Sequence, residues 1–190
     1  MKTKALMLSL AMSCAFAGSA MALTKAEYKT EKDRISADYK VAKDKCRSLK
    51  SNAKDICMSE AKGVEKIAKA EAESGYKPSA SNTKKVGMAK AGAMYDTAKE
   101  KCDDLSGNAK DVCVKDAKVT YTKAKDDAKI TKVSMDTSKS KSEKMADVKK
   151  DAREDENKAK YKAANERCDA LAGAPKDACQ NDAKVKYGMK

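Results

Sequence analysis

The sequence contains seven cysteines, and six of them form three pairs with identical spacing. Ten residues separate the two members of each pair, which are Cys46/Cys57, Cys102/Cys113 and Cys168/Cys179. Paired cysteines can bind a metal ion, catalyse thiol–disulfide exchange or form a structural disulfide. The chemistry of this protein depends first on which of these the pairs do.

Metal binding and redox catalysis both need features that this sequence lacks. Zinc sites usually use histidines or cysteines about two to four residues apart, and neither occurs here. Redox catalysis usually uses a Cys-x-x-Cys motif, which is missing although Lys45, Lys101 and Arg167 precede the first cysteine of each pair. We therefore predict a structural disulfide within each pair and no metal ion or other cofactor. Pairing between repeats or between chains is the alternative.

Each cysteine pair lies in one copy of a longer sequence repeat, which covers residues 39–62, 95–118 and 161–184. Midway between the cysteines stand turn-forming residues that differ between copies: Lys50-Ser51-Asn52, Gly107-Asn108 and Gly173-Ala174-Pro175. Glycine favours the end of a helix, proline its first position, and asparagine its N-cap. The pattern predicts a helical hairpin in which Asn52 and Asn108 cap the second helix and the cysteines face each other.

The composition favours long helices over a thick core. Residues 23–190 contain 17 Leu, Ile, Val and Phe but 27 Ala, and no stretch alternates in the manner of a strand. Alanine is the strongest helix former, with Lys and Glu close behind. We predict an all-α fold of three disulfide-stapled helical hairpins, each with a thin Ala-rich contact stripe, joined by flexible linkers.

Capping and loop residues predict the boundaries of these hairpins. Thr24 and Glu27 fit a capping box at the first helix, and Pro78 interrupts any helix in its neighbourhood. The expected organisation is a signal peptide (1–22), hairpin 1 (23–74), a linker (75–84), hairpin 2 (85–132), a linker or weak helix (133–142) and hairpin 3 (143–190). Residues 143–158 are expected to project from the bundle, and the sequence leaves open whether residues 109–171 form one helix.

The amino-terminal segment has the parts of a secretory signal peptide. Lys2 and Lys4 precede an apolar run, and Ala20-Met21-Ala22 forms a cleavage site. Cleavage after Ala22 removes Cys14 and leaves the six paired cysteines, which indicates an oxidising compartment, the bacterial periplasm. The alternative is an uncleaved membrane anchor. No later run is apolar enough to cross a membrane.

The charge of the chain favours anionic partners. Without Lys2 and Lys4 there are 40 basic and 29 acidic residues, a net charge of +11. Residues 74–94 contain no acid, and their lysines are a candidate anion-binding site: Lys77, Lys84, Lys85 and Lys90. The alternative is a solvated linker. We expect no catalytic site, since the sequence has no histidine and no glycine-rich phosphate loop.

The Ala/Lys/Asp/Glu composition of residues 85–165 resembles that of the helical stalk of the cell-envelope protein TolA. The cysteine hairpins resemble small exported bacterial proteins of unknown role. We predict a non-enzymatic periplasmic protein that acts as a structural or stress-related spacer, or binds anionic envelope polymers or lipid head groups. One alternative is a chaperone or assembly partner that offers its Ala, Tyr and Met stripes to other helices. Another is a histone-H1-like nucleic-acid binder, against which export argues.

Overall fold

The computed structural model describes residues 22–189, so the predicted signal peptide lies almost wholly outside the described residues. Within this range the fold is all-helical and has no strand. The prediction of an all-α fold built from three disulfide-stapled hairpins is confirmed. The helices are α1 (Lys25–Cys46), α2 (Ser51–Tyr76), α3 (Ala80–Cys102), α4 (Gly107–Ser134), α5 (Lys141–Cys168) and α6 (Ala174–Tyr187).

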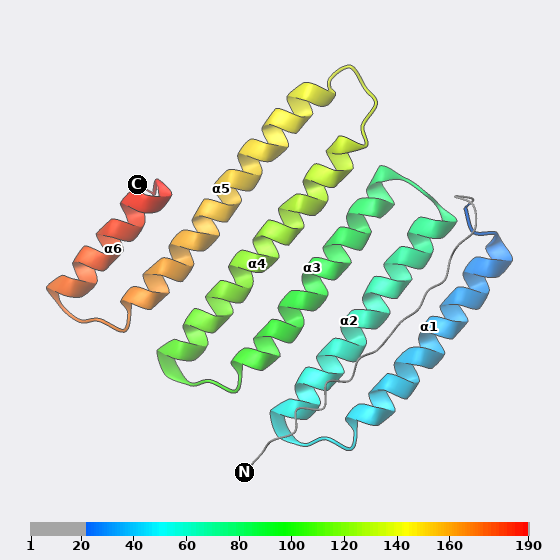
Figure 1. The fold of residues 1–190 in the computed structure, drawn as a ribbon, viewed down its shortest axis with the longest axis horizontal. Helices are drawn as coiled ribbons and strands as arrows, with labels where there is room; N and C mark the ends of the chain where they lie inside the picture. The colour runs from blue at the N-terminus through cyan, green and yellow to red at the C-terminus, as the bar shows by residue number, and fades with distance from the viewer. Residues whose placement is uncertain (1–21, 190) are drawn as a thin grey trace, which may run out of the picture.

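The helices form a single layer in which each one packs antiparallel to the next (Figure 1). Among the described helices, only those consecutive in the chain come into contact. The three bends that carry disulfides therefore lie along the same edge of the layer (Figure 1). Because the layer is one helix thick, both of its broad faces are open to solvent.

Small side chains form the contacts between helices. Alanines and half-cystines make up the buried apolar residues with one exception, Ile35, which is 3% exposed. A residue without a large side chain lets two helix backbones approach closely. Gly63 of α2 lies directly against Ala93 of α3, and Gly87 of α3 against Ala128 of α4. The Ala-rich stripe predicted from composition thus becomes a set of close helix contacts, both within and between hairpins.

The joint between hairpins 1 and 2 is shorter than the sequence predicts. Helices extend into the expected linker from both sides, so that only residues 77–79 lie outside them. The Ser79 hydroxyl accepts a hydrogen bond from the Asn82 amide (3.1 Å), and the Asn82 side chain donates to the Lys77 carbonyl (2.7 Å). This cap lets α3 begin at Ala80, two residues after Pro78, and α2 then packs along α3.

The joint between hairpins 2 and 3 interrupts the helix at residues 135–140, so residues 109–171 do not form one helix. Asp136 accepts hydrogen bonds from the Ser138 amide (2.8 Å) and the Lys144 ammonium (2.7 Å), and these bonds lower the pKa of its carboxyl. The expectation that residues 143–158 project from the layer was wrong. Ala152 is 4% exposed, and α5 lies along α4, because alanine rather than a large residue supplies the contact.

Two predicted helix caps serve instead as links between hairpins. The Thr24 capping box is confirmed, but Asn52 does not cap α2. Its side chain donates to the Glu100 carbonyl of α3 (2.7 Å) and to the Asp104 carboxylate (2.8 Å). Asn108 likewise donates to the Glu166 carbonyl of α5 (2.8 Å). Each of these carbonyls also accepts a bond from the amide three residues further on, Asp103 (3.1 Å) or Asp169 (3.2 Å), so the asparagine adds a second donor that joins two hairpins.

The third hairpin shows what this link does. Alignment of the hairpins on their cysteines places Ala174 at the position of Asn52 and Asn108. In the described structure hairpin 3 ends the layer, and no further helix end lies beside it to accept the bond. The asparagine is thus present in the two hairpins that pack against a following one in the described structure, and hairpin 3 has Ala174 instead.

Replacement of Asn52 by alanine tests this link. We expect Asn52→Ala to lower the free energy of unfolding by about 1 kcal/mol, because the hydrogen bonds from Asn52 to the next hairpin are lost. Chemical denaturation of the oxidised protein measures the change. Asn157, an exposed residue of α5, provides the matched control, and equal effects of Asn52→Ala and Asn157→Ala would contradict the assignment.

Candidate functional site

The six cysteines form three disulfides, each within its own hairpin as predicted. The α-carbons lie 5.5 Å apart in Cys46–Cys57 and 5.7 Å apart in Cys102–Cys113 and Cys168–Cys179. The first cysteine of each pair is 1% exposed. In the described part of the chain, no three residues of the metal-binding types are grouped to hold an ion. The cysteines therefore hold helices together.

The candidate anion-binding lysines do not form a separate basic patch. Lys85 and Lys90 each lie 2.8 Å from a glutamate of α2, Glu73 and Glu71 respectively. The Lys85 ammonium lowers the pKa of the Glu73 carboxyl. Lys77 precedes α3, and its ammonium lies over the Tyr76 ring. Lys84 lies in the first turns of α3. Residues 74–94, which contain no acidic residue, therefore lie beside acidic residues of α2 in the folded protein.

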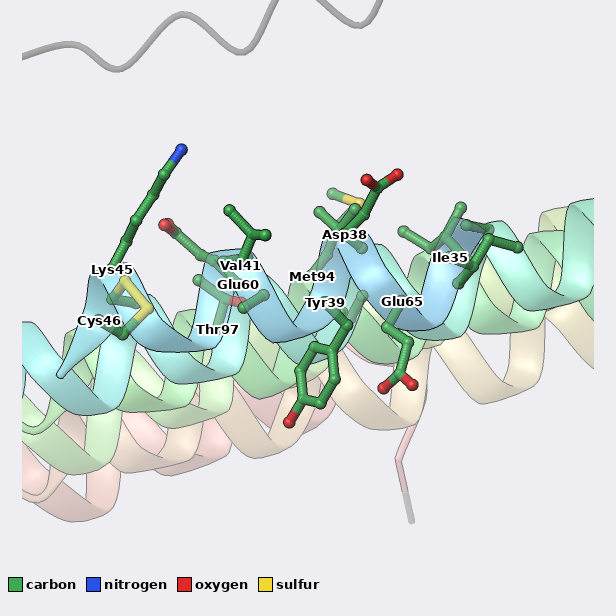
Figure 2. Close-up of a pocket in the computed structure, with 18 of the residues that line it drawn as sticks. Ile35, Asp38, Tyr39, Val41, Lys45, Cys46, Glu60, Glu65, Met94 and Thr97 are labelled. Atoms are coloured by element: carbon green, nitrogen blue, oxygen red, sulfur yellow. A yellow bond between two sulfur atoms is a disulfide. The ribbon is translucent and has the colours of Figure 1, made fainter. Parts of the chain in front are cut away.

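A different feature stands out as a site: an elongated groove that runs along α2 and is bounded by α1 and α3. We call it the α2 groove. It has a volume of about 930 Å³, and its apolar lining includes Ile35 and Val41 of α1, Val64 and Ile67 of α2, and Met94 of α3. Figure 2 shows Val41, Asp38 and Lys45 on one side of the layer, whereas Tyr39 and Glu65 extend from the other. The Cys46–Cys57 disulfide closes one end of this groove.

Three large apolar side chains of the α2 groove are strongly exposed. Val41 is 55%, Val64 46% and Met94 57% exposed. Such residues at one site are more informative than the same residues scattered singly over a surface. They lie on three different helices, so that no single stretch of sequence brings them together.

A comparison of the hairpins with one another shows that the fold does not require these apolar residues. When the cysteines are aligned, Val41 and Val64 correspond to Thr97 and Thr120 in hairpin 2, and Met94 corresponds to Lys160 in hairpin 3. The exposed leucines of the bends behave differently, because Leu49, Leu105 and Leu171 occur in all three hairpins. The leucines thus belong to the common bend, whereas the apolar cluster of the groove is particular to that place.

Charged groups mark the two ends of the α2 groove. At the disulfide end lie Lys45 and Lys101, the latter 3.3 Å from Glu60. At the opposite end the Arg34 guanidinium lies 2.6 Å from Glu31 and 2.7 Å from Asp38. The hydrogen bonds from Arg34 lower the pKa of the Glu31 carboxyl, which keeps it ionised. A charged ligand would therefore meet a different environment at each end.

The arrangement is suited to binding a partner. Its lining combines an apolar floor with ion pairs at the rim, the pattern of a surface that excludes water from a partner. The pattern within each hairpin does not predict this site, because its residues come from two hairpins. The available signal was the departure of Val41, Val64 and Met94 from the polar residues at equivalent positions.

Comparisons with protein-family models, with curated proteins and with solved structures find no match to this chain. Within residues 22–189, no helix combines the length and the apolar character that a membrane span requires.

Proposed function

We propose that this protein is a non-enzymatic binding module of the periplasm that holds a polypeptide partner in the α2 groove. Among the functions that the sequence suggests, this one corresponds to the chaperone or assembly partner. The observation that carries it is the exposed cluster of Val41, Val64 and Met94, whose counterparts on α3, α4 and α5 are the polar residues Thr97, Thr120 and Lys160. Exposed apolar side chains that the fold does not require become favourable when a bound partner removes them from water.

The rigidity of the groove supports the same proposal. Its walls are fixed by the Cys46–Cys57 disulfide between α1 and α2 and by the bond from Asn52 to the Glu100 carbonyl between α2 and α3. Lys66–Asp96 (3.1 Å) and Lys101–Glu60 (3.3 Å) cross the same α2–α3 interface. A preformed site loses less conformational entropy on binding than a flexible one.

The net positive charge favours a second candidate, the binding of anionic envelope polymers or lipid head groups. The lysines proposed for that role lie outside the lining of the α2 groove. The two functions are therefore separable, because removal of the apolar cluster would abolish polypeptide binding and leave anion binding unchanged.

Site-specific photo-crosslinking in the expressing cell tests the polypeptide-binding function. A photoreactive residue at position 64 is expected to give a discrete adduct with a partner protein. The combined substitutions Val41→Thr and Met94→Lys, which place the polar residues of the equivalent positions in the groove, should reduce this adduct by about tenfold or more. They should change stability little, since both side chains are exposed.

Val185 supplies the control position, because it is 83% exposed on α6. The α6 helix lies at the opposite end of the layer from α1 and α2 (Figure 1). The same photoreactive residue there should give no such adduct. Equal adducts at positions 64 and 185, or an adduct at position 64 that the groove substitutions leave unchanged, would refute the proposal.

A further inference from the structure

We infer that the occupant of the α2 groove is an amphipathic α-helix of a partner protein, about three turns long, whose acidic residues lie beside Lys45. This inference rests on the proposed function and names the class of partner. It follows from the shape of the groove, from its backbone chemistry, from the extent of its apolar cluster and from the charges at its ends.

The shape of the groove matches one helix. On α1 its lining runs from Arg34 to Cys46, which at 1.5 Å per residue is about 18 Å, or three helical turns. The α1 and α3 helices flank α2 without touching each other, and side chains of all three helices line the groove. A helix that lies along this groove would pack at an ordinary interhelical distance of about 8–10 Å.

Backbone chemistry favours a helix over an extended segment. An extended peptide needs partners for its amide and carbonyl groups when it is removed from water. The groove is lined by three helices whose own backbones are bonded internally, and within residues 22–189 there is no strand edge to pair with. A bound helix instead satisfies its backbone by itself and presents only side chains to the groove.

The apolar cluster is too small for a second copy of this chain. Stable interfaces bury about 800 Å² on each partner, whereas the strongly exposed apolar residues of this groove are Val41, Val64 and Met94. The equivalent positions in the rest of the layer carry Thr120 and Lys160. Two layers in contact would bury those polar groups without gain, while a single helix covers only the cluster.

The charges give the bound helix an orientation. In the described part of the chain, no carboxylate lies within ion-pair distance of the Lys45 ammonium, which extends from the layer at the disulfide end of the groove (Figure 2). At the other end two carboxylates, Glu31 and Asp38, surround one guanidinium. A helix with acidic residues at one end and basic residues at the other is complementary to this arrangement.

A pair of designed peptides tests the inference. Both are amphipathic helices with a Leu/Ala stripe and lysines at one end, and they differ in having Glu or Gln at the other end. Fluorescence anisotropy with the oxidised protein gives their dissociation constants. We expect the Glu peptide to bind about threefold more tightly than the Gln peptide. The difference should vanish in Lys45→Gln and persist in Lys149→Gln, a control at an exposed residue of α5.

A photoreactive group beside the Glu residues should cross-link to the disulfide end of the groove, and Val64→Thr should weaken both peptides. Equal affinity of the two peptides, or cross-links spread along the groove, would overturn the orientation. Binding by neither peptide would overturn the helical occupant, while a persistent cellular adduct at position 64 would leave the proposed function intact. A wild-type dimer that Val41→Thr with Met94→Lys converts to a monomer would identify a second copy as the occupant and overturn the inference.

Discussion

Reduction of the three disulfides is expected to abolish the stable tertiary fold. Each bridge joins cysteines 11 residues apart, and closure of such a loop in the unfolded chain stabilises the native state by about 3 kcal/mol. The three bridges together contribute about 8–9 kcal/mol, which is comparable to the whole stability of a typical domain, about 5–15 kcal/mol. The thin core makes the loss harder to tolerate, because Ile35 is the only large aliphatic residue among the described buried ones.

Circular dichroism and thermal unfolding before and after reduction measure this effect. Double substitution of one pair, for example Cys102→Ser with Cys113→Ser, should give about one third of the loss. The protein with all three pairs substituted provides the control, since the reductant should not alter it further. An unchanged unfolding midpoint after verified reduction would show that helix packing alone stabilises the layer.

Substitution of Gly87 by valine is expected to lower the free energy of unfolding by about 3 kcal/mol. A β-carbon at Gly87 of α3 would lie 2.6 Å from the Ala128 β-carbon of α4. That distance is far inside van der Waals contact, and Ala128 has no flexible side chain that can move away. The two helices must therefore separate, which disturbs the contacts along their length.

Gly92 provides a control on the same helix. A β-carbon there would meet nothing within 4 Å, so Gly92→Ala should raise the free energy of unfolding by about 1 kcal/mol through helix propensity alone. Gly87→Ala should instead be destabilising despite the same gain in propensity. Chemical denaturation of Gly87→Val, Gly87→Ala and Gly92→Ala measures the change in the free energy of unfolding of each variant. A stabilised Gly87→Ala protein would show that α3 and α4 separate without cost.

The disulfides could be predicted from the sequence, whereas the α2 groove could not. The disulfide pairing followed from positions that lie within one hairpin, because both cysteines are equally distant from a bend. The α2 groove depends on Val41, Val64 and Met94, which come from α1, α2 and α3. The pattern of each helix predicts a contact stripe within its own hairpin. It does not predict that residues of the next hairpin pack beside that stripe, so the cluster cannot be read from the sequence.

The roles of Asn52 and Lys85 depended on long-range contacts for the same reason. Asparagine near a bend is a good candidate for a cap, yet Asn52 bonds to a carbonyl 48 residues away. Lys85 belongs to a stretch without acids, yet it lies beside Glu73 of the preceding helix. Capping rules and charge patterns concern residues that are close in sequence. The partners of Asn52 and Lys85 instead come close because α2 packs against α3.

Composition and cysteine spacing were sufficient to predict helices, bends and the disulfides between them, since helix propensity, capping and loop closure act over a few residues to a dozen. The arrangement of the hairpins was not predictable in this way. Alanine and glycine allow close approach on many sides of a helix, so a thin stripe permits several packings. The contacts of Gly63 with Ala93 and of Asn52 with the Glu100 carbonyl select one continuous layer, and that layer creates the α2 groove.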